Sequence, residues 1–296
     1  MATTTQPIRL IDSTNRMRTK PMRILVLGMP RTGTSTLSIA LRKLGYTPHQ
    51  MRQVLANPED LALWHEAINV TLISPPDRPI AQRSLKPYRR SEFDKLLADY
   101  DVVMDLPGCV LALPLLEAYP EAKVILTTRQ YEDWEASMQE SIWCLCTWRL
   151  FALARYFDVS SMAPLMRLMH AVFRAHNKNH YGGTQAKVAY EKHYAAVREL
   201  VPRERLLEID PQTSDWETLC GFLEKDVPDE RWPKMAEEKG MRANLEHVWW
   251  EFMYYCIKMC LVPGGALVLG IWFWANADVF RGVRDDFLRP YAHSSI

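Results

Sequence analysis

The sequence has almost no excess of charge of either sign. Its 36 lysine and arginine residues are balanced by 35 aspartate and glutamate residues, which leaves a formal net charge of +1 over 296 residues. Proteins that hold nucleic acid by its phosphates present a basic patch or stripe, and no such stripe stands out along this chain. The charge balance therefore argues against a nucleic acid partner.

Cysteine is also sparse, and its spacing does not suit a metal site. Of the six cysteines, Cys144 and Cys146 are two residues apart in a predicted helix and so face different sides. Cys256 and Cys260 share a helix face that has no histidine nearby. The first residues show no pattern of a secretory signal peptide. We therefore expect no metal site, reduced thiols and a cytosolic location for the folded domain.

Internal repeats and low-complexity runs are absent, and 48% of the residues are apolar, which is enough to bury a full core. Short apolar runs at residues 24–27, 100–106, 122–128 and 205–210 predict strands, and helical stretches separate them. This alternation predicts an α/β fold in which helices flank a mostly parallel sheet. The expected organisation has three parts: a flexible N-terminal arm over 1–20, an α/β domain over 21–240, and a hydrophobic helical segment over 241–296.

The first predicted strand runs into a loop of small residues that is followed by a helical pattern. Four residues separate Gly28 from Gly33, as in the phosphate-binding loop G-x-x-x-x-G-K-[ST], but Thr34 occupies the lysine position. The absence of this lysine argues against the interpretation that the protein hydrolyses ATP or GTP. Backbone N–H groups at the start of a helix still favour an anion. The alternative is a helix start that merely caps itself with its own hydroxyls. The predicted anion-binding residues are Arg31, Thr32, Gly33, Thr34, Ser35 and Thr36.

A second candidate for anion binding follows the strand at residues 124–127. Arg129 leaves the carboxyl end of this strand, where open α/β sheets bind their ligands, and Ser137 lies eight residues further on in a predicted helix. A guanidinium can grip a phosphate with two hydrogen bonds, and a hydroxyl can add a third. The alternative is a surface ion pair of Arg129 with Glu132 or Asp133.

These motifs resemble those of a known family. The run Pro30-Arg31-Thr32-Gly33-Thr34-Ser35-Thr36 resembles the P-K-S-G-T-T-W loop of PAPS-dependent sulfotransferases, with Arg31 in the lysine position. Residues 25–37, "LVLGMPRTGTSTL", are more closely similar to the loop of a fungal family of sulfotransferase-like P-loop proteins. The similarity continues in order through "NPEDLALW", "AYPEAKVILTTRQYEDWEASM", "ERLLEID" and "DWETLCGFL", and so covers about residues 22–225.

The resemblance implies a sulfotransferase fold and PAPS as the donor. It places the first loop at the 5′-phosphosulfate and the pair Arg129 and Ser137 at the 3′-phosphate. The implied reaction moves a sulfuryl group to a hydroxyl of a small organic molecule, such as a specialised metabolite. Sulfuryl transfer depends mainly on positioning and on donors aimed at the equatorial oxygens, so Arg31 is expected to contribute to catalysis as well as to binding.

The acceptor hydroxyl needs a general base. Asp105 is the first candidate, because "VVMDLP" places it at the end of a strand beside the loop and the fungal family also has an aspartate before a proline-containing turn; the alternative is a helix N-cap. His49 is the second candidate. Aligning the methionine of the family's "Y-H-M" puts Gln50 in the histidine position and leaves His49 displaced by one residue. His65 and His193 are expected to be structural.

Two other functions stay open at this point. The displaced histidine is compatible with the same scaffold carrying out an elimination, a rearrangement or a cyclisation. A non-catalytic, membrane-tethered nucleotide-binding protein would also keep the loop. The acceptor pocket is expected to be apolar because of Trp64, Trp143 and Trp148, although packing in the core accounts for these side chains equally well.

The run from Met259 to Ala277 contains no charged residue. As a helix it would be about 28 Å long, close to the hydrocarbon thickness of a bilayer. Pro263 and two following glycines count against a straight span. The alternative is a hairpin of helices that packs on the domain or forms a homodimer contact. Aromatic residues flank the run as in membrane interfaces, namely Trp249, Trp250, Tyr254, Tyr255, Trp272 and Trp274. We predict membrane association through residues 249–277, as a tail anchor or as a helix lying against the bilayer.

Overall fold

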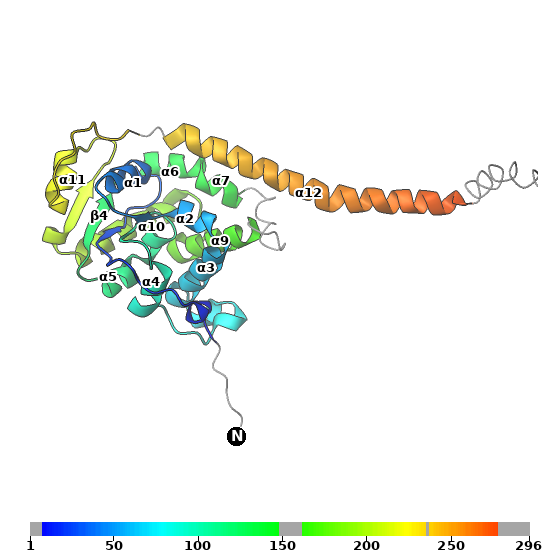
Figure 1. Cartoon of the computed structure of the whole chain (residues 1–296), viewed down its shortest axis with the longest axis horizontal. Helices are drawn as coiled ribbons and strands as arrows, with labels where there is room; N and C mark the ends of the chain where they lie inside the picture. The colour runs from blue at the N-terminus through cyan, green and yellow to red at the C-terminus, as the bar shows by residue number, and fades with distance from the viewer. Residues whose placement is uncertain (1–7, 148–161, 235–236, 278–296) are drawn as a thin grey trace, which may run out of the picture. The chain divides into compact units, whose positions relative to one another are not determined.

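The computed structural model describes residues 8–147, 162–234 and 237–277 (Figure 1). The strands are β1 (Ile24–Val26), β2 (Pro48–His49), β3 (Val102–Val103), β4 (Lys123–Thr127) and β5 (Leu206–Ile209). The α-helices are α1 (Thr34–Lys43), α2 (Met51–Ala56), α3 (Pro58–Leu72), α4 (Arg90–Leu96), α5 (Ala112–Ala118), α6 (Tyr131–Gln139), α7 (Ile142–Thr147), α9 (Met162–Asn177), α10 (Gly183–Leu200), α11 (Trp216–Leu223) and α12 (Glu237–Ala275). The 3₁₀ turns are η1 (Leu10–Ser13), η2 (Pro75–Asp77), η3 (Ile80–Gln82), η4 (Gly108–Leu111) and η5 (Arg203–Arg205).

The five strands form one parallel sheet with the order β2-β3-β1-β4-β5. Strand β1 lies at the centre, with β3 on one side and β4 on the other. The predicted α/β fold with a parallel sheet is therefore confirmed. Strand β2 was not predicted, because its two residues, Pro48 and His49, carry no apolar run. All five carboxyl ends meet at one edge of the sheet, where ligands bind in folds of this kind.

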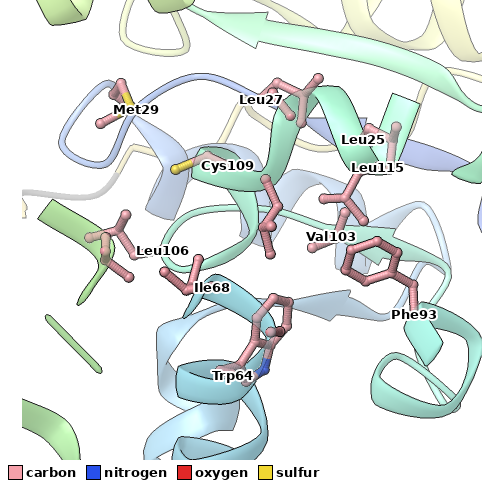
Figure 2. Close-up of a cluster of buried hydrophobic side chains, with 14 of the residues drawn as sticks. Leu25, Leu27, Met29, Trp64, Ile68, Phe93, Val103, Leu106, Cys109 and Leu115 are labelled. Atoms are coloured by element: carbon pink, nitrogen blue, oxygen red, sulfur yellow. The ribbon is translucent and has the colours of Figure 1, made fainter. Parts of the chain in front are cut away.

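Successive residues of each strand point to opposite faces of the sheet. On one face, Ile24 and Val26 pack with Leu37 of α1 and with Leu219 of α11. On the other face, Leu25 belongs to a larger cluster to which α3, α4, α5, α6, α9 and α10 contribute. Figure 2 shows part of this larger cluster, whose labelled members are Leu25, Leu27, Met29, Trp64, Ile68, Phe93, Val103, Leu106, Cys109 and Leu115. The sheet is thus covered by helices on both faces, and α3 and α9 lie side by side in the larger layer (Figure 1).

Residues 8–20 lie against the α/β domain. The prediction of a flexible arm over 1–20 did not anticipate these contacts. Ile11 is fully buried, and its neighbour Leu10 donates its backbone N–H to Glu66 at 2.9 Å. Arg16 pairs with the buried Asp60 at 2.7 Å. A sequence of mixed polar and apolar residues gives no periodic signal for contacts of this kind. Residues 1–7 lie outside the described part of the chain.

The chain divides into two compact units, Met1–Glu238 and Lys239–Ile296. Helix α12 supplies the described part of the second unit, so the expected hydrophobic helical extension is present. The helix continues through Pro263 without interruption.

Candidate active site

The loop between β1 and α1 is pressed closely against strand β4. A Cβ atom added to Gly28 would lie 2.0 Å from Oγ1 of Thr127, so only glycine fits here without displacing β4. Gly33 ends the loop at a φ of +83°, where an L side chain is strained, and an added Cβ would lie 3.0 Å from Pro211. The loop is therefore held between β4 and the turn that follows β5.

Side chains from other elements bind the carbonyl oxygens at the start of this loop. Nε2 of His193 lies 2.7 Å from the carbonyl oxygen of Leu27, so this ring nitrogen must carry the proton and donate it. Within the loop, Oγ1 of Thr32 donates to the carbonyl oxygen of Met29 at 2.6 Å. The same hydroxyl lies 2.6 Å from Oγ1 of Thr127. The buried Thr32 hydroxyl is thus occupied by the protein, and this residue can serve an anion through its backbone N–H.

The next two carbonyl oxygens are held in the same way. The indole Nε1 of Trp134 donates to the carbonyl oxygen of Pro30 at 2.8 Å. Nη1 of Arg129 donates to the carbonyl oxygen of Arg31 at 2.9 Å. These carbonyl groups are turned toward side chains of the domain, and no described side chain caps the first turn of α1, so the N–H groups at this helix start can face a ligand.

The start of α1 has the features of an anion site. No side chain among the described residues caps its first N–H groups, although Ser and Thr are abundant there. This argues against the alternative of a self-capped helix start. Oγ1 of Thr36 is buried without a hydrogen-bond partner in the described part of the chain. Ser35 is half-buried, whereas Thr34 is buried. The loop and helix start thus offer N–H and O–H donors to an anion.

The structure brings the two predicted anion-binding segments together. Nε of Arg31 donates to Oγ of Ser137 at 3.0 Å, and Arg129 reaches the backbone of Arg31 as described above. The alternative was a surface ion pair of Arg129 with Glu132 or Asp133. The described residues do not form it: Arg129 donates to the loop backbone, and Glu132 pairs with Lys187 at 2.8 Å. Two arginine side chains and a hydroxyl therefore lie beside the loop, and groups of these kinds bind phosphate or sulfate through charge-assisted hydrogen bonds.

Asp105 lies at the same edge of the sheet, just after β3. Because β3 pairs with β1, this position is next to the start of the loop. The residue is half-buried and has a φ of +60°. Its carbonyl oxygen accepts the N–H of Cys109 at 2.9 Å. The N-cap of η4 is Pro107, so Asp105 does not hold the N-cap position of the turn that follows. Burial, and then the negative charge of Asp105, raise the pKa of the Cys109 thiol.

His49 ends strand β2, but its ring is enclosed in the core. The ring centroid lies 5.1 Å from that of Trp64 and 4.8 Å from that of Tyr100. Neither ring nitrogen has a hydrogen-bond partner among the described residues, and burial lowers the pKa of His49 to about 3. The residue is buried and its ring packs against core aromatic side chains, so it is not open to a ligand in this conformation. Gln50, which follows it, is the N-cap of α2 and exchanges hydrogen bonds with Gln53.

The remaining candidates from the sequence have packing roles. His193 binds the loop carbonyl, and a ring nitrogen of His65 lies 3.1 Å from the side-chain nitrogen of Asn69. Trp64 and Trp143 are buried in the larger hydrophobic cluster, and Trp148 lies outside the described residues. Within the described ranges no group of three or more His, Cys, Asp or Glu side chains could hold a metal ion. The sequence reasoning missed Trp134, Tyr190 and Tyr194, whose only signal is apolar spacing on a helix.

Two comparisons with known proteins bear on this site. The sequence profile of a family described as "Sulfotransferase domain" matches residues 23–241. The chain is also 35% identical over 263 residues to "Ava biosynthesis cluster protein M" of Aspergillus versicolor. That alignment covers 86% of this chain and 97% of the relative. The match to the family profile includes the loop, Asp105, Arg129 and Ser137.

Proposed function

The chain belongs to the sulfotransferase domain family, and we propose that it transfers a sulfuryl group from PAPS to a hydroxyl of a small organic molecule. The observation that carries this proposal is the convergence of Arg31, Arg129 and Ser137 beside an uncapped helix start. The relative's name refers to a biosynthesis cluster, which supports a specialised metabolite as the acceptor.

The residues at the site fit PAPS in charge and in hydrogen bonding. The N–H groups of residues 32–36 and the hydroxyls of Thr34, Ser35 and Thr36 suit its 5′-phosphosulfate. Arg129 and Ser137 suit its 3′-phosphate. When bound, PAPS supplies an activated sulfuryl group whose leaving group is a phosphate. Arg31, which is held at the centre of the site by Ser137, stabilises negative charge on the transferring group.

In the proposed mechanism Asp105 acts as the general base. Its carboxylate takes the proton of the acceptor hydroxyl as the acceptor oxygen bonds to sulfur and the bond between sulfur and the phosphate oxygen breaks. The products are a sulfate ester and adenosine 3′,5′-bisphosphate. A carboxylate on the strand next to the loop suits this step, whereas the enclosed ring of His49 has no path to an acceptor in this conformation.

The test uses the full-length protein in mild detergent with radiolabelled PAPS. Binding is measured first, and transfer of label to a pool of hydroxylated small molecules is measured second. Label that moves to an organic product supports the proposal. Absence of binding by both PAPS and adenosine 3′,5′-bisphosphate would overturn it. Binding without transfer would favour the second candidate, which is a different reaction on the same scaffold. Two observations motivate this candidate: His49 is enclosed in the core, and Gln50 occupies the position of the family's histidine.

We also propose that α12 enters a lipid bilayer. The segment Trp249–Ala275 is long and apolar enough to cross a membrane by length and composition, and its most apolar stretch is not buried within the protein. Exposed apolar side chains follow one another at Leu267, Val268, Leu269, Ile271, Trp272, Phe273 and Trp274. Consecutive positions point in all directions around a helix, so this stretch has no polar face. A helix that lies on a membrane surface needs such a face, and insertion into the hydrocarbon is therefore favoured.

Membrane insertion is tested by flotation of the full-length protein with lipid vesicles after an alkaline wash. The double variant Leu261→Lys with Leu267→Lys is expected to leave the vesicle fraction, because both positions lie near the middle of Trp249–Ala275, where charge is costly. The matched control is Leu113→Lys on α5, where an exposed leucine lies on the α/β domain. Recovery of the unaltered protein as a dimer without detergent and without vesicles would contradict insertion.

A further inference from the structure

Tyr194 of α10 joins two parts of the candidate site through one buried hydroxyl. The side chain is only 3% exposed. Its hydroxyl donates to the carbonyl oxygen of Thr127 at 2.8 Å, at the last position of β4. The same oxygen accepts the N–H of Met29, in the loop after β1, at 3.1 Å. Burial raises the pKa of this phenol well above its ordinary value, so the hydroxyl remains protonated and keeps both bonds.

Two more side chains on the same face of α10 bind backbone carbonyl groups of the site. The hydroxyl of Tyr190 donates to the carbonyl oxygen of Arg129 at 2.8 Å. His193 donates to the carbonyl oxygen of Leu27 at 2.7 Å. Positions 190, 193 and 194 follow the spacing that puts residues on one side of a helix. This face of α10 thus contacts the backbone of the loop and also the backbone of the residue that carries the second guanidinium.

We propose that this face of α10, formed by Tyr190, His193 and Tyr194 and called here the α10 clamp, positions the two anion-binding segments relative to each other. The inference rests on the proposed function, since it assigns the two segments to the two ends of one nucleotide. The clamp side chains bind the backbone of the loop, of Thr127 and of Arg129, and do not provide the donors that face a ligand. They are positioning residues. Their effect is preorganisation: a site whose donors are fixed before binding loses less freedom when a ligand arrives.

Within the clamp, Tyr194 and Tyr190 have separable effects. Tyr194 fixes the loop that would hold the 5′ group, whereas Tyr190 fixes the backbone of Arg129, which would hold the 3′-phosphate. The variant Tyr194→Phe removes one oxygen and keeps the ring. It is expected to lower affinity for adenosine 3′,5′-bisphosphate and for adenosine 5′-monophosphate alike, by about tenfold, because Met29 N–H and Thr127 C=O lose their partner. The variant Tyr190→Phe should weaken only the bisphosphate.

The matched control is Tyr131→Phe. Tyr131 belongs to the same aromatic cluster, with its ring centroid 5.6 Å from that of Tyr190. Its hydroxyl donates to the carbonyl oxygen of Gly183 at 3.2 Å, away from the loop. This variant loses a tyrosine hydroxyl from the same region and is expected to bind both nucleotides as the unaltered protein does. A purely structural role of Tyr194 would make the two tyrosine variants behave alike.

The experiment has two readouts on full-length protein in detergent. Calorimetric titration gives the two nucleotide affinities, and hydrogen exchange of peptides that cover residues 27–36 gives the rigidity of the loop without any ligand. Faster loop exchange in Tyr194→Phe, together with unchanged loop exchange in Tyr131→Phe, supports the clamp. This holds even if the unaltered protein binds neither nucleotide, because absence of nucleotide binding would overturn the proposed function alone. Unchanged loop exchange, or unchanged affinities in a protein that does bind, would overturn the clamp.

Discussion

Arg31 allows backbone strain and ligand binding to be separated in one pair of variants. The residue has a φ of +68°, in the region that favours glycine, and its side chain donates to Ser137 at 3.0 Å. Arg31→Ala and Arg31→Gly remove the same guanidinium. Removal of a contact between a charged donor and an anion costs about 1.5–3 kcal/mol, so each variant should bind adenosine 3′,5′-bisphosphate roughly tenfold to a hundredfold more weakly.

The two variants should differ in stability. An alanine held in the left-handed region loses about 1–2 kcal/mol of stability, and glycine avoids this loss. The greater freedom of glycine in the unfolded chain offsets about 0.5–1 kcal/mol of the advantage of the glycine variant. Arg31→Gly should therefore be more stable than Arg31→Ala by about 0.5–1 kcal/mol, or on the order of 1–4 °C in melting temperature. Both variants lose the bond to Ser137, so that contribution cancels in the comparison.

Calorimetric titration with adenosine 3′,5′-bisphosphate and urea unfolding of the full-length variants in the same detergent measure the two quantities. An alanine variant that is more stable than the glycine variant would refute the left-handed conformation at residue 31. Affinities equal to that of the unaltered protein would refute the anion site, because the side chain that contributes a fixed positive charge to the loop is missing from both variants.

Three further predictions concern other residues of the domain. Asp105→Asn should lower turnover by about a hundredfold or more while donor affinity stays the same; an equal loss in both would count against a role as the base. Arg129→Ala should weaken binding of adenosine 3′,5′-bisphosphate more than that of adenosine 5′-monophosphate, and equal losses would contradict its assignment to the 3′-phosphate. Burial lowers the pKa of His49 to about 3 from 6.5, so the unfolded chain binds a proton that the native state does not, and stability should fall by about 1.4 kcal/mol per pH unit as the pH drops from 6.5 toward 3. His49→Phe should make urea unfolding less dependent on pH by this amount, and an unchanged dependence would show that the ring is solvated.

Much of the sheet could be predicted because its strands are short apolar runs. Apart from Lys123 at the start of β4, the residues of β1, β3 and β4 are buried on both faces, so these strands appear as continuous segments instead of alternating ones. Strand β2 could not be found in this way, since Pro48 and His49 pair with β3 over only two residues. Contacts of residues 8–20 escaped prediction for a similar reason: Ile11 is a single buried side chain among neighbours that are exposed or half-buried.

The candidate site was partly predictable because loops and strand ends place their residues by topology. The convergence of Arg31 with Arg129 and Ser137 follows from adjacent strands whose carboxyl ends meet. The enclosure of His49 does not follow from its own neighbours, since the covering rings of Trp64 and Tyr100 lie 15 and 51 residues away along the chain. The role of the clamp residues of α10 could not be predicted either. A tyrosine at a buried helix position indicates core packing whether or not its hydroxyl binds a loop.

The replacement of the usual loop lysine by Thr34 has a physical counterpart in the structure. In nucleoside triphosphatases that lysine contacts the β- and γ-phosphates, and a metal ion shares their charge. A phosphosulfate has fewer charged oxygens at this end than a triphosphate, so fewer fixed positive charges are needed. Here Arg31 brings one guanidinium to the loop from an earlier position, and its Nε is directed by Ser137. The carbonyl oxygens of residues 27 and 29–31 are held by side chains of α10, of α6, of the segment that follows β4, and of the loop itself. The loop can therefore rely on oriented N–H groups where a triphosphatase relies on an ammonium group, which favours a single sulfuryl or phosphoryl end group over a polyphosphate chain.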